Sequence, residues 1–279
     1  MLLSVFLREG AHRLEALYPP GEARSLVERL CRDLCGFKPY DHIVRPDLEA
    51  PEVLSAALER LLAGEPLQYV AGWTEFYGRR FNVCPGVLIP RPETEILVRE
   101  ACVRALNVRE PRVLDLCTGS GCIAWSIALE VPEAKVTGVD ISEVALRVAR
   151  AQNPGDGDNR PEFVLADVLG EGSFPGGPFD IIVANPPYIR ESERANMHPN
   201  VLEHEPSLAL FVPDEDPLLF YRAIAGIAKR SLVPGGWGMV EINEALGQET
   251  AAVFEDAGLR KVQVFSDFFG RDRFVSFVL

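Results

Sequence analysis

From residue 112 onward, short apolar runs alternate with amphipathic stretches of helical period. The apolar runs predict strands at Arg112–Leu116, Lys135–Asp140, Glu162–Ala166, Asp180–Ala184 and Gly236–Ile242. The stretches between and after them predict helices at Gly121–Leu129, Glu143–Gln152, Pro217–Ser231 and Glu244–Ala257. Strand–helix alternation with short loops is typical of an α/β fold with a doubly wound, mostly parallel sheet. Two further apolar runs, Lys261–Phe265 and Arg273–Leu279, complete a seven-stranded sheet, and since no helix separates them, one of the two should be antiparallel.

A different pattern precedes this region and predicts a small all-α N-terminal domain over residues 1–72. Its helical stretches carry apolar residues at three- and four-residue spacing, and each ends at a proline or glycine. Aromatic residues then alternate with polar ones around Gly78, which predicts a β-hairpin linker over residues 73–91. A second domain would occupy residues 92–279. It begins with a predicted helix over residues 94–107, whose inward side should carry Ile96, Leu97, Ala101 and Val103 or Leu106.

The charge balance and the cysteines narrow the classes of partner and site. With 41 acidic against 28 basic residues, the formal net charge is −13, and a field of this sign disfavours phosphate backbones. No apolar stretch approaches the roughly 20 residues needed to span a bilayer. The six cysteines lack the spacing of a disulfide scaffold, and Cys31 and Cys35, one helical turn apart, are better explained as small core residues than as metal ligands. These features predict a cytoplasmic protein with no metal site, no stable nucleic-acid binding and no membrane contact.

The tetrapeptide Asn185-Pro186-Pro187-Tyr188 directly follows the predicted strand Asp180–Ala184. Neither proline has an N–H group and each fixes its own φ, so the turn is stiff and its carbonyls point in fixed directions. The Asn185 side-chain oxygen and the Pro186 carbonyl can both accept hydrogen bonds from one NH2 group, and Tyr188 offers an aromatic face. This arrangement suits an amide or exocyclic amine that is held while its nitrogen attacks. Alternatively, the prolines only break the chain between a strand and the next helix.

Three acidic residues lie in or after successive predicted strands, near the ends where such sheets bind ligands. Asp115 precedes the turn Cys117-Thr118-Gly119-Ser120-Gly121, whose two glycines let the backbone approach a ligand closely. The spacing is not the Gly-x-Gly-x-x-Gly of dinucleotide folds, and Asp115 would repel a pyrophosphate but suit a cationic ligand. Asp140 ends the next strand and can accept both hydroxyls of a ribose. Asp167 can accept an adenine amino group while Val168 covers the ring, although either aspartate alone could instead cap a helix.

Taken in strand order, these groups describe S-adenosylmethionine beside a nitrogen nucleophile, and the chain resembles the PrmC/HemK family of protein-(glutamine-N5) methyltransferases, which modify peptide chain release factors. The resemblance covers nearly the whole chain. Besides the tetrapeptide, it rests on Pro66-Leu67-Gln68-Tyr69, Gly72, Glu75-Phe76-Tyr77-Gly78, Val87-Leu88-Ile89-Pro90-Arg91-Pro92-Glu93-Thr94-Glu95, Glu205-Pro206 and Ala209-Leu210. The Pro-Arg-Pro-Glu-Thr-Glu segment distinguishes this family from most other amine methyltransferases. The chain departs from the family at Cys117, where glycine is usual, and a cysteine fits there only if the backbone has an ordinary φ or the loop adapts.

The resemblance implies a class I, Rossmann-like methyltransferase domain that takes a methyl group from S-adenosyl-L-methionine and leaves S-adenosyl-L-homocysteine. The acceptor would be the side-chain N5 of the glutamine in the Gly-Gly-Gln motif of release factors, bound and methylated through Asn185, Pro186, Pro187 and Tyr188. Cofactor contacts are expected from Asp115, the Cys117–Gly121 turn, Asp140, Ile141, Asp167, Val168, Asn185, Arg91 and Thr94. The release factor is the expected partner of a monomeric enzyme. The alternative is an adenine-N6 methyltransferase acting on DNA or RNA, because the tetrapeptide suits that chemistry equally well.

Overall fold

The computed structural model describes residues 1–170, 174–267 and 269–279 of the chain. These residues divide into two compact units. The first consists of Met1–Trp73 and His198–His204, and the second of Thr74–Met197 and Glu205–Leu279. A membrane-spanning helix is absent from the described residues, because none of their helices combines the necessary length and apolar character.

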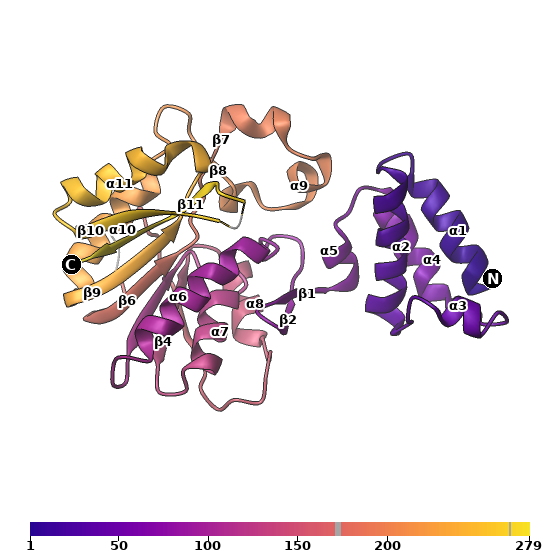
Figure 1. Ribbon diagram of the computed structural model, residues 1–279, viewed down its shortest axis with the longest axis horizontal. Helices are drawn as coiled ribbons and strands as arrows, with labels where there is room; N and C mark the ends of the chain where they lie inside the picture. The colour runs from indigo at the N-terminus through magenta and orange to yellow at the C-terminus, as the bar shows by residue number, and fades with distance from the viewer. Residues whose placement is uncertain (171–173, 268) are drawn as a thin grey trace. The chain divides into compact units, whose positions relative to one another are not determined.

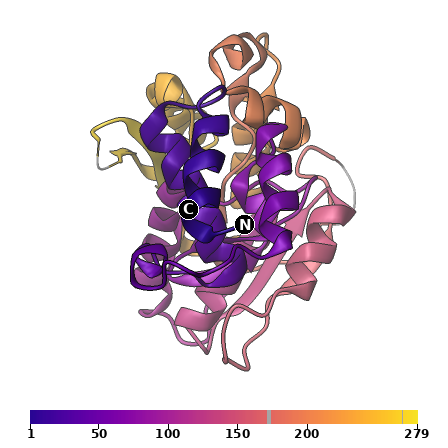
Figure 2. The ribbon, with the colours of Figure 1, turned by 90° about the vertical axis from the view of Figure 1, so that its right-hand side faces the viewer.

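The first unit is all-α. Its helices are α1 (Leu3–Leu14), α2 (Pro20–Cys35), α3 (Asp41–Val44), α4 (Glu52–Leu62), α5 (Leu67–Ala71) and α9 (Pro199–His204). Helices α1, α2 and α4 lie side by side in both views (Figure 1, Figure 2). Leu30 and Leu54 are fully buried in their shared core, and Cys31 is a buried apolar member of it. The predicted helical N-terminal region is therefore confirmed.

The predicted hairpin is formed by β1 (Trp73–Phe76) and β2 (Arg79–Asn82). Both turn residues have positive φ, +49° at Tyr77 and +70° at Gly78. This is the backbone of a two-residue hairpin turn whose twist matches that of the flanking strands. Phe76 and Phe81 are fully buried and meet edge to face, with ring centroids 6.0 Å apart. Their burial anchors the hairpin in an apolar core of the second unit.

The second unit is built on the predicted seven-stranded sheet. Its strands are β3 (Arg112–Leu116), β4 (Lys135–Asp140), β5 (Glu162–Leu165), β6 (Phe179–Ala184), β9 (Leu232–Glu241), β10 (Arg260–Ser266) and β11 (Asp272–Val278). They lie in the order β10-β11-β9-β6-β3-β4-β5, and all neighbours are parallel except those of β11, which is antiparallel to β9 and to β10. The α/β class and the antiparallel member of the last pair are confirmed. A short parallel pair, β7 (Ile189–Arg190) and β8 (Phe211–Val212), lies outside this sheet.

Helices cover both faces of the sheet (Figure 1). They are α6 (Glu95–Ala105), α7 (Cys122–Glu130), α8 (Glu143–Ala151), α10 (Leu219–Ser231) and α11 (Gly247–Asp256). Successive residues of a strand point to opposite faces. Val113 and Ile181 accordingly share one apolar core with α6, α7 and α8, whereas Leu114 and Ile182 share the other with α10 and α11.

One detail of the predicted core is wrong. The inward side of α6 does include Leu97 and Ala101, which are fully buried. Val103 and Leu106, offered as alternatives for the next inward position, are instead 53% and 69% exposed. Cys102 and Ala105 take that place, because they lie four residues after the buried Val98 and Ala101 and therefore on the same side of the helix.

Candidate active site

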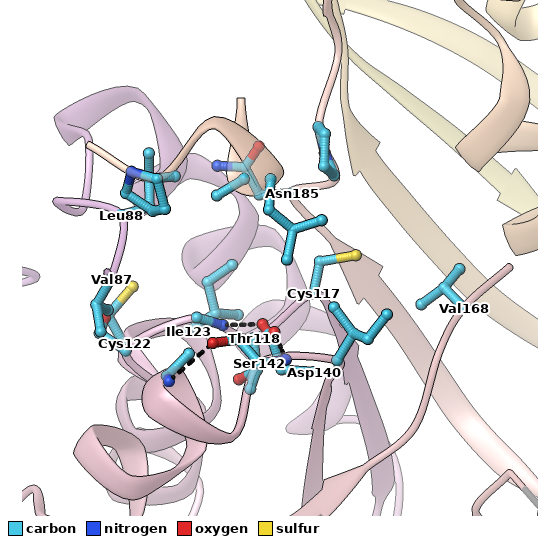
Figure 3. Close-up of a pocket in the computed structure, with 18 of the residues that line it drawn as sticks. Val87, Leu88, Cys117, Thr118, Cys122, Ile123, Asp140, Ser142, Val168 and Asn185 are labelled. Carbon is cyan, nitrogen blue, oxygen red and sulfur yellow. Dashed lines mark hydrogen bonds between the residues drawn. The ribbon is translucent and has the colours of Figure 1, made fainter. Parts of the chain in front are cut away.

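A cavity opens at the carboxyl ends of β3, β4, β5 and β6, where a doubly wound sheet binds its ligands. Figure 3 shows Cys117, Asp140, Val168 and Asn185 around it, each from the loop or strand end of a different strand. The predicted site residues that line it are Arg91, Thr94, Cys117, Thr118, Gly119, Ser120, Asp140, Ile141, Asp167, Val168, Asn185 and Pro187. The other four predicted residues, Asp115, Gly121, Pro186 and Tyr188, are not part of the lining formed by the described residues. The fold thus brings most of the predicted site together from the ends of four strands and from the segment before α6.

The two glycines of the turn after β3 have different tasks. Both have positive φ, +55° at Gly119 and +78° at Gly121. A Cβ on Gly119 would meet no described atom within 4 Å, so this lining residue leaves space toward a ligand. A Cβ on Gly121 would lie 2.9 Å from the Phe163 ring and 3.0 Å from the Ala149 Cβ. Gly119 is therefore placed to admit a ligand, and Gly121 allows the turn to pack against the protein.

Cys117 adopts the backbone of a glycine. Its φ is +57°, in the left-handed region that a side chain with a Cβ occupies only with strain. An ordinary φ, one of the two ways in which a cysteine was expected to fit here, is excluded. Burial raises the pKa of the Cys117 thiol well above its usual value, and the carboxylates of Asp140, Asp115 and Asp167 act in the same direction. The thiol is therefore protonated at neutral pH.

Asp140 is held by two backbone amides at the end of β4. Its Oδ2 accepts a hydrogen bond from the Gly119 N–H and its Oδ1 accepts one from the Ser142 N–H, both at 2.8 Å. Each carboxylate oxygen has a second lone pair, so both can still accept a hydroxyl group from a ligand. Burial raises the pKa of Asp140, and the amides oppose this shift. Ser142, whose side chain accepts from the Ala145 N–H, caps α8, which excludes the helix-cap interpretation of Asp140.

Asp167 stands at the third strand end and uses one oxygen within its own turn. Its Oδ1 accepts a hydrogen bond from the Leu169 N–H at 2.8 Å. In the described part of the chain, no helix begins at this residue, so it has no helix-capping role there. Asp167 and Val168 both face the cavity, and Asp167 keeps Oδ2 as an acceptor.

Asp115 lies beneath the turn and outside the cavity lining. It is fully buried and accepts a hydrogen bond from the Thr118 hydroxyl at 2.5 Å. Burial raises the pKa of Asp115 to about 7, and the bond from Thr118 lowers it by a smaller amount. Thr118 itself lines the cavity. Asp115 is therefore in a position to shape the turn, with Thr118 between it and any ligand.

The tetrapeptide after β6 divides between the cavity and the core. Asn185, labelled in Figure 3, lines the cavity, and its Nδ2 donates a hydrogen bond to Thr94 Oγ1 at 3.2 Å. Pro187 also belongs to the lining. Tyr188 packs against the apolar core of α10 and α11, and its hydroxyl donates to Glu241 Oε1 at 2.9 Å. Burial, followed by the nearby Glu241 carboxylate, raises the pKa of Tyr188 well above its usual value. The phenol is therefore a neutral hydrogen-bond donor.

A buried carboxylate joins two distant segments of the cavity wall. Glu205 accepts hydrogen bonds from the Ile89 N–H at 3.1 Å and from Arg91 Nη2 at 2.7 Å. Its side chain is only 1% exposed. Arg91 and Pro206 both line the cavity, so Glu205 holds the segment before α6 next to the segment that follows Glu205 itself.

The comparisons with known proteins agree with this geometry. The model of the PrmC N-terminal domain matches residues 6–72, and that of the methyltransferase small domain matches residues 94–206. A release factor glutamine methyltransferase of Bacteroides thetaiotaomicron is 44% identical over 278 residues, which is 98% of this chain and 98% of that protein. One of Flavobacterium psychrophilum is 36% identical and covers 99% of this chain and 98% of that protein.

The chain belongs to the release factor glutamine methyltransferase family. The resemblance drawn from its motifs is confirmed, and the protein is a methyltransferase enzyme. A methyltransferase of Pyrococcus furiosus has a related structure, with a TM-score of 0.50 and 16% identity over 72% of this chain and 89% of that one. At that identity the likeness shows the fold alone, and it is the class I, Rossmann-like fold expected of the family.

Sequence reasoning missed several apolar lining residues of this family member, and it missed one buried carboxylate, Glu241, that holds two of the predicted site residues. Glu241 ends β9 after the buried run Trp237–Val240 and is only 1% exposed. It accepts hydrogen bonds from Thr94 Oγ1 at 2.7 Å and from Tyr188. The sequence did contain one sign of this role, an acidic residue at the end of an apolar strand. Burying such a group is costly unless it has hydrogen-bond partners. Those partners, however, lie 147 and 53 positions away along the chain, which no local spacing could reveal.

Proposed function

We propose that the protein methylates the side-chain N5 of the glutamine in the Gly-Gly-Gln motif of peptide chain release factors. S-Adenosyl-L-methionine is the donor and S-adenosyl-L-homocysteine the product. The observation that carries the proposal is the position of Asn185, whose amide stands in the cavity at the strand ends. The chain also matches release factor glutamine methyltransferases over nearly its whole length. Release factors work in the cytoplasm, so we expect the enzyme there, as a monomer that binds the release factor as substrate.

The lining of the cavity suits S-adenosylmethionine. The molecule presents ribose hydroxyls, an adenine ring and a positive charge, and the cavity offers carboxylate acceptors and apolar surface. Asp140 would accept the ribose hydroxyls, and Asp167 would accept the adenine amino group, with Val168 against the ring. The open space at Gly119 admits the ligand close to the backbone. When bound, S-adenosylmethionine supplies a methyl group on a sulfonium, which departs as a neutral thioether.

The protein's task at the acceptor is to make an amide nitrogen nucleophilic. The lone pair of a carboxamide is delocalised into the carbonyl, so it attacks only when it is aimed at the methyl group at about 3 Å. Asn185 Oδ1 and the Pro186 carbonyl would accept the two N–H bonds of the glutamine and hold its nitrogen in that direction. Among the described residues, none donates a hydrogen bond to Asn185 Oδ1, so this acceptor is available.

The same two acceptors stabilise the transition state more than the ground state. Positive charge grows on the nitrogen as the new bond forms, and oxygen acceptors on its N–H bonds stabilise that charge. The N-protonated product is a strong acid and loses its proton after the transfer, so the reaction needs no general base in the site. Tyr188 lies outside the cavity lining with its hydroxyl bonded to Glu241, so it would support the tetrapeptide and not contact the glutamine directly.

Mass spectrometry of a release factor incubated with the enzyme and S-adenosylmethionine tests the proposal directly. We expect one methyl group on the glutamine of the Gly-Gly-Gln motif. Asn185→Ala should lower kcat by about a hundredfold or more, by analogy with the loss of one preorganised polar group, while S-adenosylmethionine still binds. Asn107→Ala is the matched control, because Asn107 is an exposed residue outside the cavity lining and should leave kcat unchanged.

A duplex DNA substrate in parallel reactions separates the alternative. Adenine presents a planar amine that the tetrapeptide could also hold after base flipping. Methylated DNA together with an unmodified release factor would refute the proposed substrate while leaving the interpretation of Asn185 intact. Full activity of Asn185→Ala on the release factor would refute the role of Asn185.

A further inference from the structure

Four side chains form a continuous hydrogen-bonded path from the core to the cavity. Tyr188 OH donates to Glu241 Oε1 at 2.9 Å, and Thr94 Oγ1 donates to Glu241 Oε2 at 2.7 Å. Asn185 Nδ2 then donates to Thr94 Oγ1 at 3.2 Å. Glu241 and Thr94 are both buried, at 1% and 2% exposure. The path thus joins both ends of the tetrapeptide to one buried carboxylate.

The donor and acceptor roles along this path follow from the chemistry of the Glu241 carboxylate. An ionised carboxylate has acceptor sites only, so both hydroxyls facing Glu241 must donate to it. Thr94 has a single hydrogen, and once that hydrogen points to Glu241, its oxygen presents only lone pairs to Asn185. Asn185 must then turn its NH2 group toward Thr94. Its carbonyl oxygen Oδ1 is left as the end of the amide that can face a substrate.

The surroundings of Glu241 raise its pKa overall, and its hydrogen-bond donors act against that rise. Burial raises the pKa of Glu241, and Glu93 acts in the same direction with a smaller effect. The hydrogen bonds from Thr94 and Tyr188 and the charge of Arg273 act against that rise. The polarity described here is that of the ionised form, in which both oxygens of Glu241 accept and both hydroxyls donate.

We infer that Glu241 and Thr94 are positioning residues that set the polarity of Asn185, so that its oxygen and not its NH2 group meets the acceptor nitrogen. This inference rests on the proposed function, in which Asn185 Oδ1 accepts an N–H bond of the substrate. An asparagine amide is nearly symmetric in shape, and a reversed amide would present donors to a donor. Thr94 reaches this position because Pro92 starts the single 3-10 turn Pro92–Thr94 that leads into α6.

Three substitutions test the path through the rate of methyl transfer. Thr94→Val keeps the shape but removes the hydroxyl, and Glu241→Gln supplies a group that can donate as well as accept. Each should lower kcat by about tenfold or more, equivalent to about 1.4 kcal/mol or more of transition-state stabilisation. Thr94→Ser restores the hydroxyl and should recover most of the loss seen in Thr94→Val. Thr250→Val is the matched control, because the buried Thr250 hydroxyl has no partner among the described residues and is absent from the cavity lining.

A double-mutant cycle separates positioning from a general loss of structure. If Thr94 and Glu241 act through Asn185, then Thr94→Val and Glu241→Gln should cause no further loss of kcat in an Asn185→Ala background. Losses of equal size in both backgrounds would overturn the inference. So would a Thr94→Ser variant as slow as Thr94→Val.

The NMR signal of the Asn185 side-chain NH2 group tests the same path without methyl transfer. It is assigned by its absence from Asn185→Ala. We expect its proton shifts to change in Thr94→Val and Glu241→Gln and to stay close to the wild-type values in Thr94→Ser and Thr250→Val. Unchanged shifts in the first pair would refute the path even in an active enzyme. If the wild-type enzyme leaves release factors unmodified while the shifts change in the variants as expected, the proposed substrate is refuted and the hydrogen-bonded path is retained.

Discussion

Replacement of Cys117 by glycine and by alanine gives a test in which the smaller side chain should be the more stable one. Both variants remove the sulfur, so they differ only in the Cβ. With φ at +57°, a Cβ at this position costs roughly 1–2 kcal/mol. The greater freedom of glycine in the unfolded chain costs about 0.5–1 kcal/mol and favours alanine. Cys117→Gly should therefore exceed Cys117→Ala in unfolding free energy by up to about 1.5 kcal/mol, at roughly 2–4 °C of melting temperature per kcal/mol.

Cys102 provides the matched site, because it is a buried cysteine within helix α6. There, alanine should be about 1 kcal/mol more stable than glycine, the ordinary preference of a helix interior. Urea unfolding followed by tryptophan fluorescence suits the comparison, since the buried Trp125 and Trp237 both report on the second unit. An alanine preference of equal size at positions 117 and 102 would contradict the left-handed backbone at Cys117. It would also show that backbone strain does not account for any destabilisation by a cysteine in this turn.

Two further predictions concern the same turn. The pKa of Asp115 is raised to about 7, so the folded protein keeps a proton that the unfolded chain releases near pH 4, and this contribution to stability is lost as the pH rises through about 7. Asp115→Asn cannot ionise, so the melting temperature of the variant minus that of the wild type should be larger at pH 8 than at pH 5. A difference that is the same at both pH values would contradict the raised pKa. Gly121→Ala adds a contact of 2.9 Å with Phe163 to a left-handed backbone and should be less stable than Gly119→Ala by about 1–3 kcal/mol. Binding of S-adenosylmethionine, measured by calorimetry, should instead be weakened more by Gly119→Ala, because Gly119 is in the cavity lining. Equal stability of the two variants would contradict the packing role of Gly121.

The fold could be predicted in detail where the sequence pattern and the local backbone agree. The predicted bounds of β3 and β4, Arg112–Leu116 and Lys135–Asp140, are those observed, because apolar runs of that length in a buried parallel sheet have few alternatives. Helix ends were less accurate. Helix α7 begins at Cys122 and not at Gly121, since Gly121 has a left-handed φ that a helix cannot include. The predicted helix over 244–257 begins as a 3-10 turn and becomes α-helical only at Gly247.

The location of the site was predictable, but the hydrogen bonds among its side chains were not. Parallel strands place their carboxyl ends together, so Asp140, Asp167 and Asn185 could be assigned to one cavity from strand order alone. That argument says where a residue stands and not which way its side chain turns. It placed Asp115 with the ligand contacts, whereas the structure puts this residue under the turn. Side-chain direction depends on partners such as Glu241, whose bonds cross between elements far apart in the chain.

Two buried carboxylates use the same device on either side of the cavity. Asp115 accepts the Thr118 hydroxyl, and Glu241 accepts the Thr94 hydroxyl, so each threonine has its hydrogen directed away from its remaining neighbours. Both threonines line the cavity. An oxygen whose hydrogen is already committed presents only lone pairs, and its surroundings must be arranged to meet them. At Thr94 the Asn185 amide does so. Thr118 Oγ1 faces Gly138 of the neighbouring strand, where a Cβ would lie 2.7 Å from the Phe163 ring and 2.8 Å from Thr118 Oγ1. A glycine within a buried strand, unfavourable by propensity, is thus required here by the space that Phe163 and Thr118 occupy.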